Sequence, residues 1–263
     1  MNVAPARLDQ YEPVKLQTAD LSVDRLLARY GGHPPVFSDV SFTVGRGEAV
    51  ALIGANGAGK STLLKCLLGF VAPAGGAVSI FGSDLSGLRA GDLRRLRSGI
   101  GFVAQKHNLV PRLTALSNVV HGLLAARPGP RSWVQALAPV DSRRRALATL
   151  DRVGLADLAM RRVDSLSGGQ SQRVAIARAV VPEPRLVLAD EPAASLDPAA
   201  GEVVMDVLAR VVRETGATLV FTTHNLAHAL AHGRRVVGLR EGTLALDAPS
   251  HGLAIGDLRG LYD

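Results

Sequence analysis

The residues with the clearest chemical potential lie in the segment Gly54-Ala55-Asn56-Gly57-Ala58-Gly59-Lys60-Ser61-Thr62, a complete G-x-x-x-x-G-K-[ST] pattern. Its glycines allow consecutive backbone amides to turn inward around a phosphate with no Cβ in the way. Lys60 would meet the β- and γ-phosphates as a point charge, and Ser61 would offer a hydroxyl oxygen to Mg²⁺. We expect a nucleotide to be bound by Gly54, Asn56, Gly57, Gly59, Lys60, Ser61 and Thr62. A glycine-rich surface turn before a helix is the alternative.

Two adjacent carboxylates, Asp190 and Glu191, follow the apolar run Arg185–Ala189. Because side chains alternate along an extended chain, the two acids can have different roles. Asp190 could hold Mg²⁺, and Glu191 could orient or deprotonate an attacking water. The alternative is a turn that carries incidental acids.

A third candidate is Leu166-Ser167-Gly168-Gly169-Gln170, which precedes an apolar helix. Serine, two glycines and a helix N-terminus together make a second anion-binding end. Ser-Gly-Gly is also a common loop sequence, so the motif alone leaves both interpretations open.

The elements that must position these residues alternate between strand and helix patterns. Expected strands are Leu21–Val23, Val40–Val44, Ala49–Ile53, Ala77–Phe81, Ile100–Ala104, Arg185–Ala189, Thr218–Thr222, Val236–Leu239 and Thr243–Leu246. Expected helices are Ser61–Leu68, Ala90–Arg97, Ala115–Ala126, Ser142–Val153, Arg173–Val181, Ala199–Glu214 and Leu226–His232. This alternation predicts an α/β fold with a mostly parallel sheet covered on both faces.

We expect one domain over residues 14–263, after an N-terminal extension of residues 1–13. Residues 14–104 and 167–263 would form a nucleotide-binding core. Residues 105–166, which have helical character with a break at Pro128-Gly129-Pro130, would form an inserted helical subdomain.

Hydropathy, cysteine content and charge limit the classes of protein to which the chain could belong. No apolar run reaches the length needed to cross a bilayer, and residues 1–20 lack an apolar signal core, so we expect the chain to remain cytosolic. The single cysteine, Cys66, excludes an internal disulfide framework. The net charge of +7 could indicate nucleic acid or an anionic membrane, but aromatic residues total only 4% and the arginine clusters are scattered. We therefore favour solvated helix faces as the explanation of these clusters.

Taken in order, the motifs resemble those of ATP-binding cassette (ABC) ATPases. The set comprises Gly54–Thr62, Gln105, Leu166–Gln170, Leu188–Pro192, Ser195-Leu196-Asp197 and Thr223-His224. The resemblance implies a P-loop core, an N-terminal antiparallel β subdomain and a helical insertion. It implies that Gln105 contacts the metal and the attacking water, that His224 contacts the γ-phosphate, and that Tyr30 stacks on adenine. Phe37 competes with Tyr30, and the spacing of His224, His228 and His232 could also mimic a metal-binding face.

The same resemblance implies a homodimer in which Ser167 and Gly169 of one subunit close over the ATP held by Lys60 of the other. With one cassette and no coiled-coil arms, the chain is similar to importer ATPases. These enzymes sit peripherally on the cytoplasmic face of the cell (inner) membrane, with permease subunits and a substrate-binding protein. A soluble ABC ATPase of repair or translation is the alternative, and we expect no nucleic-acid partner.

A finer resemblance is to the ATPases of phosphonate importers. It is carried by Gln105–Val110, Arg112–Thr114, Asn118-Val119, Arg131–Trp133, Ala189–Pro198 and the C-terminal Asp257–Tyr262. Thr222-Thr223 before His224 and Ser171 after the signature depart from the expected pattern. The resemblance implies a Mg²⁺-dependent ATP hydrolase for phosphonate or a related oxyanion; phosphate, amino acid or metal import remains open.

Overall fold

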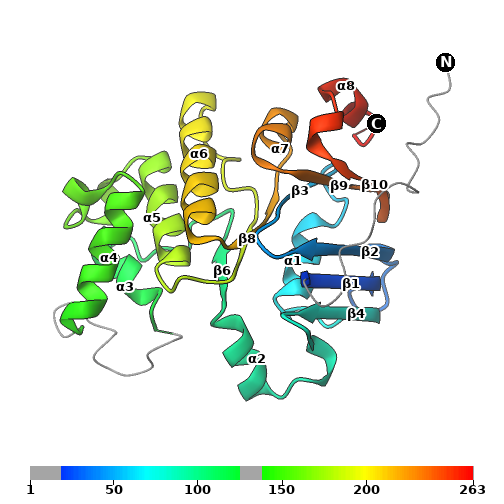
Figure 1. The fold of residues 1–263 in the computed structure, drawn as a ribbon, viewed down its shortest axis with the longest axis horizontal. Coiled ribbons are helices and arrows are strands. Elements are labelled where there is room, and N and C mark those ends of the chain that lie inside the picture. Colours follow the sequence, from blue (N-terminus) through cyan, green and yellow to red (C-terminus); the bar gives the residue numbers. More distant parts are fainter. Residues whose placement is uncertain (1–18, 125–137, 263) are drawn as a thin grey trace. The chain divides into compact units, whose positions relative to one another are not determined.

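The protein is described by a computed structural model that covers residues 19–124 and 138–262. The expected extension, residues 1–13, and the break at Pro128-Gly129-Pro130 lie outside the described residues. The chain divides into two compact units (Figure 1). Of the described residues, those up to Arg89 and from Val220 onward form unit 1, and those between Ala90 and Leu219 form unit 2.

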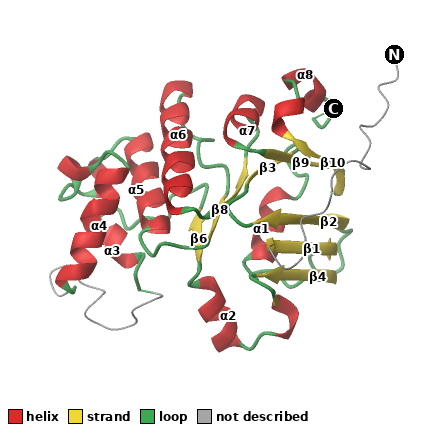
Figure 2. Ribbon diagram, in the orientation of Figure 1, coloured by secondary structure: helices red, strands yellow, loops and turns green. Residues whose placement is uncertain are grey.

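Unit 1 carries an antiparallel sheet in the order β2-β1-β4-β5, whose three longer strands lie side by side in Figure 2. The strands are β1 (Ala19–Ala28), β2 (Phe37–Gly45), β4 (Gly75–Ile80) and β5 (Ser83–Asp84). Their inward residues are apolar and buried, including Leu21, Val23, Val40 and Ile80. This sheet confirms the expected N-terminal antiparallel subdomain.

A second set of strands in unit 1 supports the glycine loop. β3 (Ala49–Ile53) pairs in parallel with β9 (Arg235–Arg240), which pairs antiparallel with β10 (Thr243–Pro249). β3 is buried on both faces, as expected for a parallel strand. The helices of this unit are α1 (Lys60–Leu67), α7 (Leu226–His232) and α8 (Ile255–Arg259), with a 3₁₀ turn at Ser250–Gly252.

Unit 2 is mainly helical. Its strands β6 (Ile100–Val103) and β7 (Leu186–Ala189) pair in parallel. Its helices are α2 (Ala90–Arg97), α3 (Ala115–His121), α4 (Val140–Arg152), α5 (Gly168–Val180) and α6 (Pro198–Thr215). The chain returns to unit 1 within β8 (Thr218–Thr222). Within the described residues, no helix is both long enough and apolar enough to span a bilayer.

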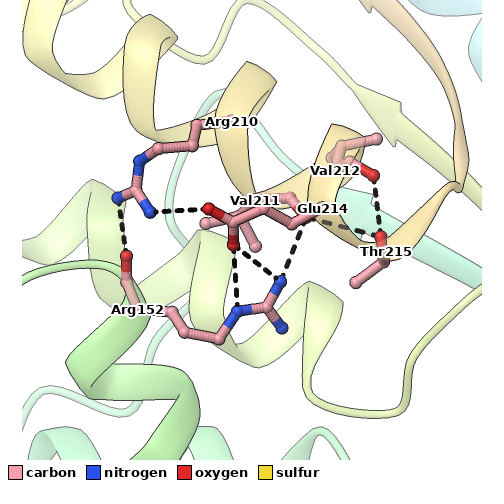
Figure 3. Close-up of polar contacts among 6 residues, drawn as sticks. All are labelled: Arg152, Arg210, Val211, Val212, Glu214 and Thr215. Carbon is pink, nitrogen blue, oxygen red and sulfur yellow. Dashed lines mark hydrogen bonds and ion pairs between the residues drawn. The ribbon is translucent and has the colours of Figure 1, made fainter.

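Helices α4 and α6 are joined by an arginine–glutamate cluster (Figure 3). Arg152 at the end of α4 donates to Glu214 and to the carbonyl of Val211, at 3.1 and 3.2 Å. Arg210 of α6 donates to the Arg152 carbonyl of α4 at 2.7 Å and, within α6, to Glu214 at 3.2 Å. The hydrogen bonds from Arg152 are the main cause that lowers the pKa of Glu214. The cluster therefore fixes the end of α4 against α6 within unit 2.

Most expected elements are confirmed, and the largest boundary errors, of five residues each, are in β1, α5 and α3. β2 begins three residues before the expected Val40, and β10 ends three residues after the expected Leu246. β1 extends to Ala28 instead of ending at Val23, because bulges near Asp24 carry the strand past its broken alternation. α5 begins at Gly168, five residues before the expected Arg173, because a Ser167–Gln170 capping box starts the helix earlier. α3 ends at His121, short of Ala126.

Candidate functional site

The glycine loop lies between β3 and α1, and its backbone conformation depends on glycine. Gly54, Gly57 and Gly59 have φ values of 148°, 86° and 97°, a region that side chains disfavour. A Cβ on Gly54 would lie 2.3 Å from the Leu239 carbonyl oxygen, and one on Gly59 would lie 2.9 Å from the Phe37 ring. The loop therefore has the curvature that lets backbone amides surround an anion, with the N-terminus of α1 directly behind it.

Lys60, the first residue of α1, is 6% exposed, and its ammonium group lies inside the loop. Its Nζ donates to the carbonyls of Gly54 and Ala55, at 2.8 and 3.0 Å. The cation is thus aimed at the concave side of the loop, while Asn56 and Gly57 are exposed at its tip. Ser61 and Thr62 follow on the first turn of α1.

The structure separates the two aromatic candidates. The Phe37 side chain is 1% exposed and packs under Gly59, so its ring belongs to the core. Tyr30 is 44% exposed, and its hydroxyl lies 3.4 Å from the Thr62 hydroxyl oxygen. Of the two rings, only that of Tyr30 is exposed beside the glycine loop.

In unit 2, the parallel pair β6 and β7 brings the expected glutamine and carboxylates to one edge. Val103 and Ala189 are in register, so Gln105, Asp190 and Glu191 follow the carboxyl ends of neighbouring strands. The Asp190 amide donates to the Val103 carbonyl at 2.8 Å, and Gln105 Nε2 lies 3.5 Å from Glu191 Oε2. This is the edge at which parallel α/β sheets place their ligands.

Glu191 has a left-handed backbone, with φ of 45°. Such a conformation costs a non-glycine residue on the order of 1–3 kcal/mol, and it is retained where the surroundings require it. Shortly after Gln105 in the chain, the carbonyls of His107 and Asn108 accept from Arg178 of α5, at 2.9 and 2.6 Å. Burial, and then the charge of Arg178, lower the pKa of His107, which favours the neutral form of that imidazole.

The Leu166–Gln170 motif forms the start of α5. The Ser167 side chain accepts from the Gln170 amide, and the Gln170 side chain accepts from the Ser167 amide at 2.9 Å. A Cβ on Gly168 would lie 3.1 Å from Leu196, so the Ser195-Leu196-Asp197 segment packs beside this helix start. Asp197 caps α6 by accepting from the Ala200 amide at 2.9 Å.

The expected histidine, His224, is exposed at the end of β8 in unit 1. Its neighbour Thr223 is anchored, because the Thr223 amide donates to the Leu52 carbonyl of β3 at 3.3 Å. His228 is 5% exposed and meets His232 edge to face at 6.0 Å between ring centroids. In the described part of the chain, no three His, Cys, Asp or Glu side chains form a group that could hold a metal ion.

Sequence reasoning missed Tyr262. Its hydroxyl lies 3.4 Å from the Gly54 amide nitrogen and 3.5 Å from the Thr223 carbonyl oxygen. Gly54 and Tyr262 are 208 positions apart. The tyrosine ends the C-terminal segment Asp257–Tyr262, which in the sequence carries only the resemblance to phosphonate-importer ATPases, and no local pattern predicts its contact with the loop.

Two features show that the residues present suit a magnesium nucleotide. The glycine loop is a cradle that Cβ atoms would fill, with a buried lysine aimed into it. In unit 1, Ser61 offers a hydroxyl oxygen, and in unit 2, Gln105 and Asp190 offer amide and carboxylate oxygens; Mg²⁺ prefers such oxygen ligands.

Comparisons with known proteins agree on one family. The profile of the ABC transporter family matches residues 37–194. The phosphonates import ATP-binding protein PhnC of Nocardia farcinica is 49% identical over 223 residues, covering 85% of this chain and 83% of that protein. Phosphonates import ATP-binding protein PhnC 2 of Oceanobacillus iheyensis is 40% identical, covering 92% and 95%. The phosphate-import ATP-binding protein PhnC of Mycolicibacterium smegmatis is 48% identical, covering 85% and 84%.

Solved structures give the same result. The ATP-binding cassette MJ0796, in a dimeric post-hydrolysis state bound to ADP and Pi, matches with a TM-score of 0.76 and 33% identity. The match covers 89% of this chain and all of that one. CbiO1 of Clostridium perfringens, part of an ABC transporter complex, matches with a TM-score of 0.79 and 29% identity, covering 89% and 90%. The chain therefore belongs to the ABC transporter family.

Proposed function

We propose that this chain is the ATP-hydrolysing subunit of an ABC importer for phosphonates or a related phosphorus oxyanion. The observation that carries the proposal is the loop Gly54–Thr62, whose left-handed glycines and inward-facing Lys60 form a phosphate cradle. The names of relatives that are 40–49% identical support phosphonate as the class of cargo.

Each expected site residue has a role in this proposal. Lys60 and the loop amides would bind the β- and γ-phosphates, with Tyr30 against the adenine. Glu191 would orient the attacking water and accept its proton, and Gln105, 3.5 Å from Glu191, would help to position that water. His224 would contact the γ-phosphate.

Mg²⁺ would be held by Ser61, Gln105 and Asp190, and when bound it would neutralise charge that develops on the phosphates. Of these residues, Asp190 is fixed by its amide hydrogen bond to β6 and Ser61 by its place on the first turn of α1. The carboxylate of Asp190 and the hydroxyl of Ser61 both offer oxygen atoms, which are the usual ligands of this hard cation.

The working unit would be a homodimer. Ser167 and Gly169 at the start of α5 would close over the nucleotide bound by the partner, because this helix start presents backbone amides and an exposed serine. The dimeric state of the MJ0796 cassette supports this arrangement. Permease subunits and a substrate-binding protein would complete an importer, with this chain on the cytoplasmic face of the membrane.

Phosphate is the second candidate cargo, because the relative from Mycolicibacterium smegmatis carries that name at 48% identity. The test is ATP turnover by this chain reconstituted with its permease and binding protein, with methylphosphonate, inorganic phosphate or neither. Stimulation by methylphosphonate supports the proposal. Stimulation by phosphate alone would replace the cargo, and turnover that neither compound changes would contradict both.

A further inference from the structure

The C-terminal segment of unit 1 brings a phenol to the glycine loop. After β10 the chain forms the short helix α8, and Tyr262 follows three residues later. The Tyr262 hydroxyl can accept from the Gly54 amide, 3.4 Å away, and donate to the Thr223 carbonyl, 3.5 Å away. One hydroxyl thus connects the first residue of the loop with the residue that precedes His224.

The position of this hydroxyl is set by buried packing. Leu258 is 0% and Leu261 is 7% exposed, and a Cβ on Gly238 of β9 would lie 2.6 Å from Leu261 Cδ1. Arg240 donates to the Gly260 carbonyl at 3.1 Å. Leu261 and the Arg240–Gly260 hydrogen bond therefore hold the end of the segment on β9, and they fix the position of the adjacent Tyr262.

Both partners of the hydroxyl are themselves constrained. Gly54 lies against the Leu239 carbonyl with no room for a Cβ, and the Thr223 amide donates to Leu52 of β3. Thr223 Oγ1 also accepts from the Asn225 amide at 3.0 Å, on the far side of His224. The Thr223 carbonyl is thus the point at which the hydroxyl can control the backbone leading into the exposed histidine.

We propose that Tyr262 is a positioning residue that fixes the spacing between the glycine loop and His224. This inference rests on the proposed function, because it requires His224 to act on the γ-phosphate. The two hydrogen bonds of the hydroxyl described above go to Gly54 and Thr223, and in the proposed function the phosphates are bound by Lys60 and the amides of residues 57–62. Its loss should therefore spare ATP binding and slow the step in which His224 must meet the phosphate.

The test is Tyr262→Phe, which keeps the ring, in the full chain assembled with its membrane subunits. The contacts of 3.4 and 3.5 Å are long, so together they should contribute about as much free energy as one good hydrogen bond. Losing that free energy from the hydrolysis step should lower kcat about five-fold. The equilibrium affinity for ATP should change by less than about two-fold, since binding contacts remain. An unchanged kcat would overturn the inference.

Two further variants separate positioning from loss of stability. Asp257→Ala removes the cap on α8, where Asp257 accepts from the Ala254 amide at 2.8 Å, and it leaves the hydroxyl in place. It should lower the unfolding temperature at least as much as Tyr262→Phe without lowering kcat. In a His224→Gln background, Tyr262→Phe should not reduce the residual turnover further, because coupled residues are non-additive. An equal reduction in both backgrounds would overturn the link to His224, and a wild-type assembly without ATP turnover would overturn the proposed function itself.

Discussion

Arg235 provides the sharpest prediction about what stabilises unit 1. Its side chain is 4% exposed, and it forms a two-point ion pair with Asp247, in which the Nη2 to Oδ2 distance is 2.6 Å. Its Nη1 donates to the Thr43 carbonyl at 2.8 Å and lies 3.4 Å from Glu48 Oε1. One guanidinium therefore joins β9, β10, β2 and the turn that leads into β3.

The perturbation is Arg235→Met, which keeps most of the apolar stem. Asp247 and Glu48 are only 15% and 14% exposed, so the variant leaves two largely buried carboxylates without their cation. Breaking such a pair by removing one partner costs about 3–5 kcal/mol. For a chain of this size, each kcal/mol lowers the unfolding temperature by about 2–4 °C, which gives a decrease of about 6–20 °C.

The assay is thermal and urea unfolding of Arg235→Met beside Arg95→Met, since the Arg95–Asp92 pair is exposed, at 84% and 40%. The control should lose no more than about 1 kcal/mol. The double variant Arg235→Met with Asp247→Leu should recover part of the loss, because an apolar pair can replace a buried ion pair. A single variant that loses no more than the control would refute this reasoning.

Two other predictions concern charge. Lys60→Ala should weaken ATP binding, measured by calorimetry, about 10- to 150-fold, which is the equivalent of one charge-assisted hydrogen bond. The control is Lys65→Ala, because Lys65 is an exposed lysine of the same helix. Unchanged ATP affinity in Lys60→Ala would refute the phosphate cradle. Glu214 has a folded-state pKa below its unfolded value, so its stabilising contribution is present at neutral pH and lost as pH falls through the folded pKa. The stability difference between wild type and Glu214→Gln should therefore shrink from pH 7 towards pH 3, and a constant difference would contradict the assignment.

Much of the fold could be predicted because the hydrophobic pattern of many segments agrees with their burial in the folded chain. β3, β8, α2 and α7 have the expected bounds, since each is a continuous apolar run or a capped amphipathic segment. The glycine loop was also predictable, because its sequence pattern places glycines at the positions whose backbone has positive φ.

The features that the sequence did not predict depend on sheet pairing, helix capping or long-range packing. The charged pair Asp24 and Arg25 hid the middle of β1, which bulges keep in the sheet. The Ser167 motif was expected at a helix N-terminus, but the helix was expected to begin only at Arg173, whereas the Ser167–Gln170 capping box starts it at Gly168. Tyr262 was missed because its contact depends on the packing of α8 and β9, on chain 208 positions from Gly54.

The most direct measurement is ATP-driven uptake of radiolabelled methylphosphonate into proteoliposomes that contain this chain, its permease and its binding protein. The proposed function predicts that wild type accumulates the compound only when ATP and Mg²⁺ are present on the face that bears this chain. Glu191→Gln should bind ATP with wild-type affinity and abolish accumulation. No uptake by the wild-type assembly would contradict the proposed importer, and sustained uptake by Glu191→Gln would contradict the catalytic role of that carboxylate.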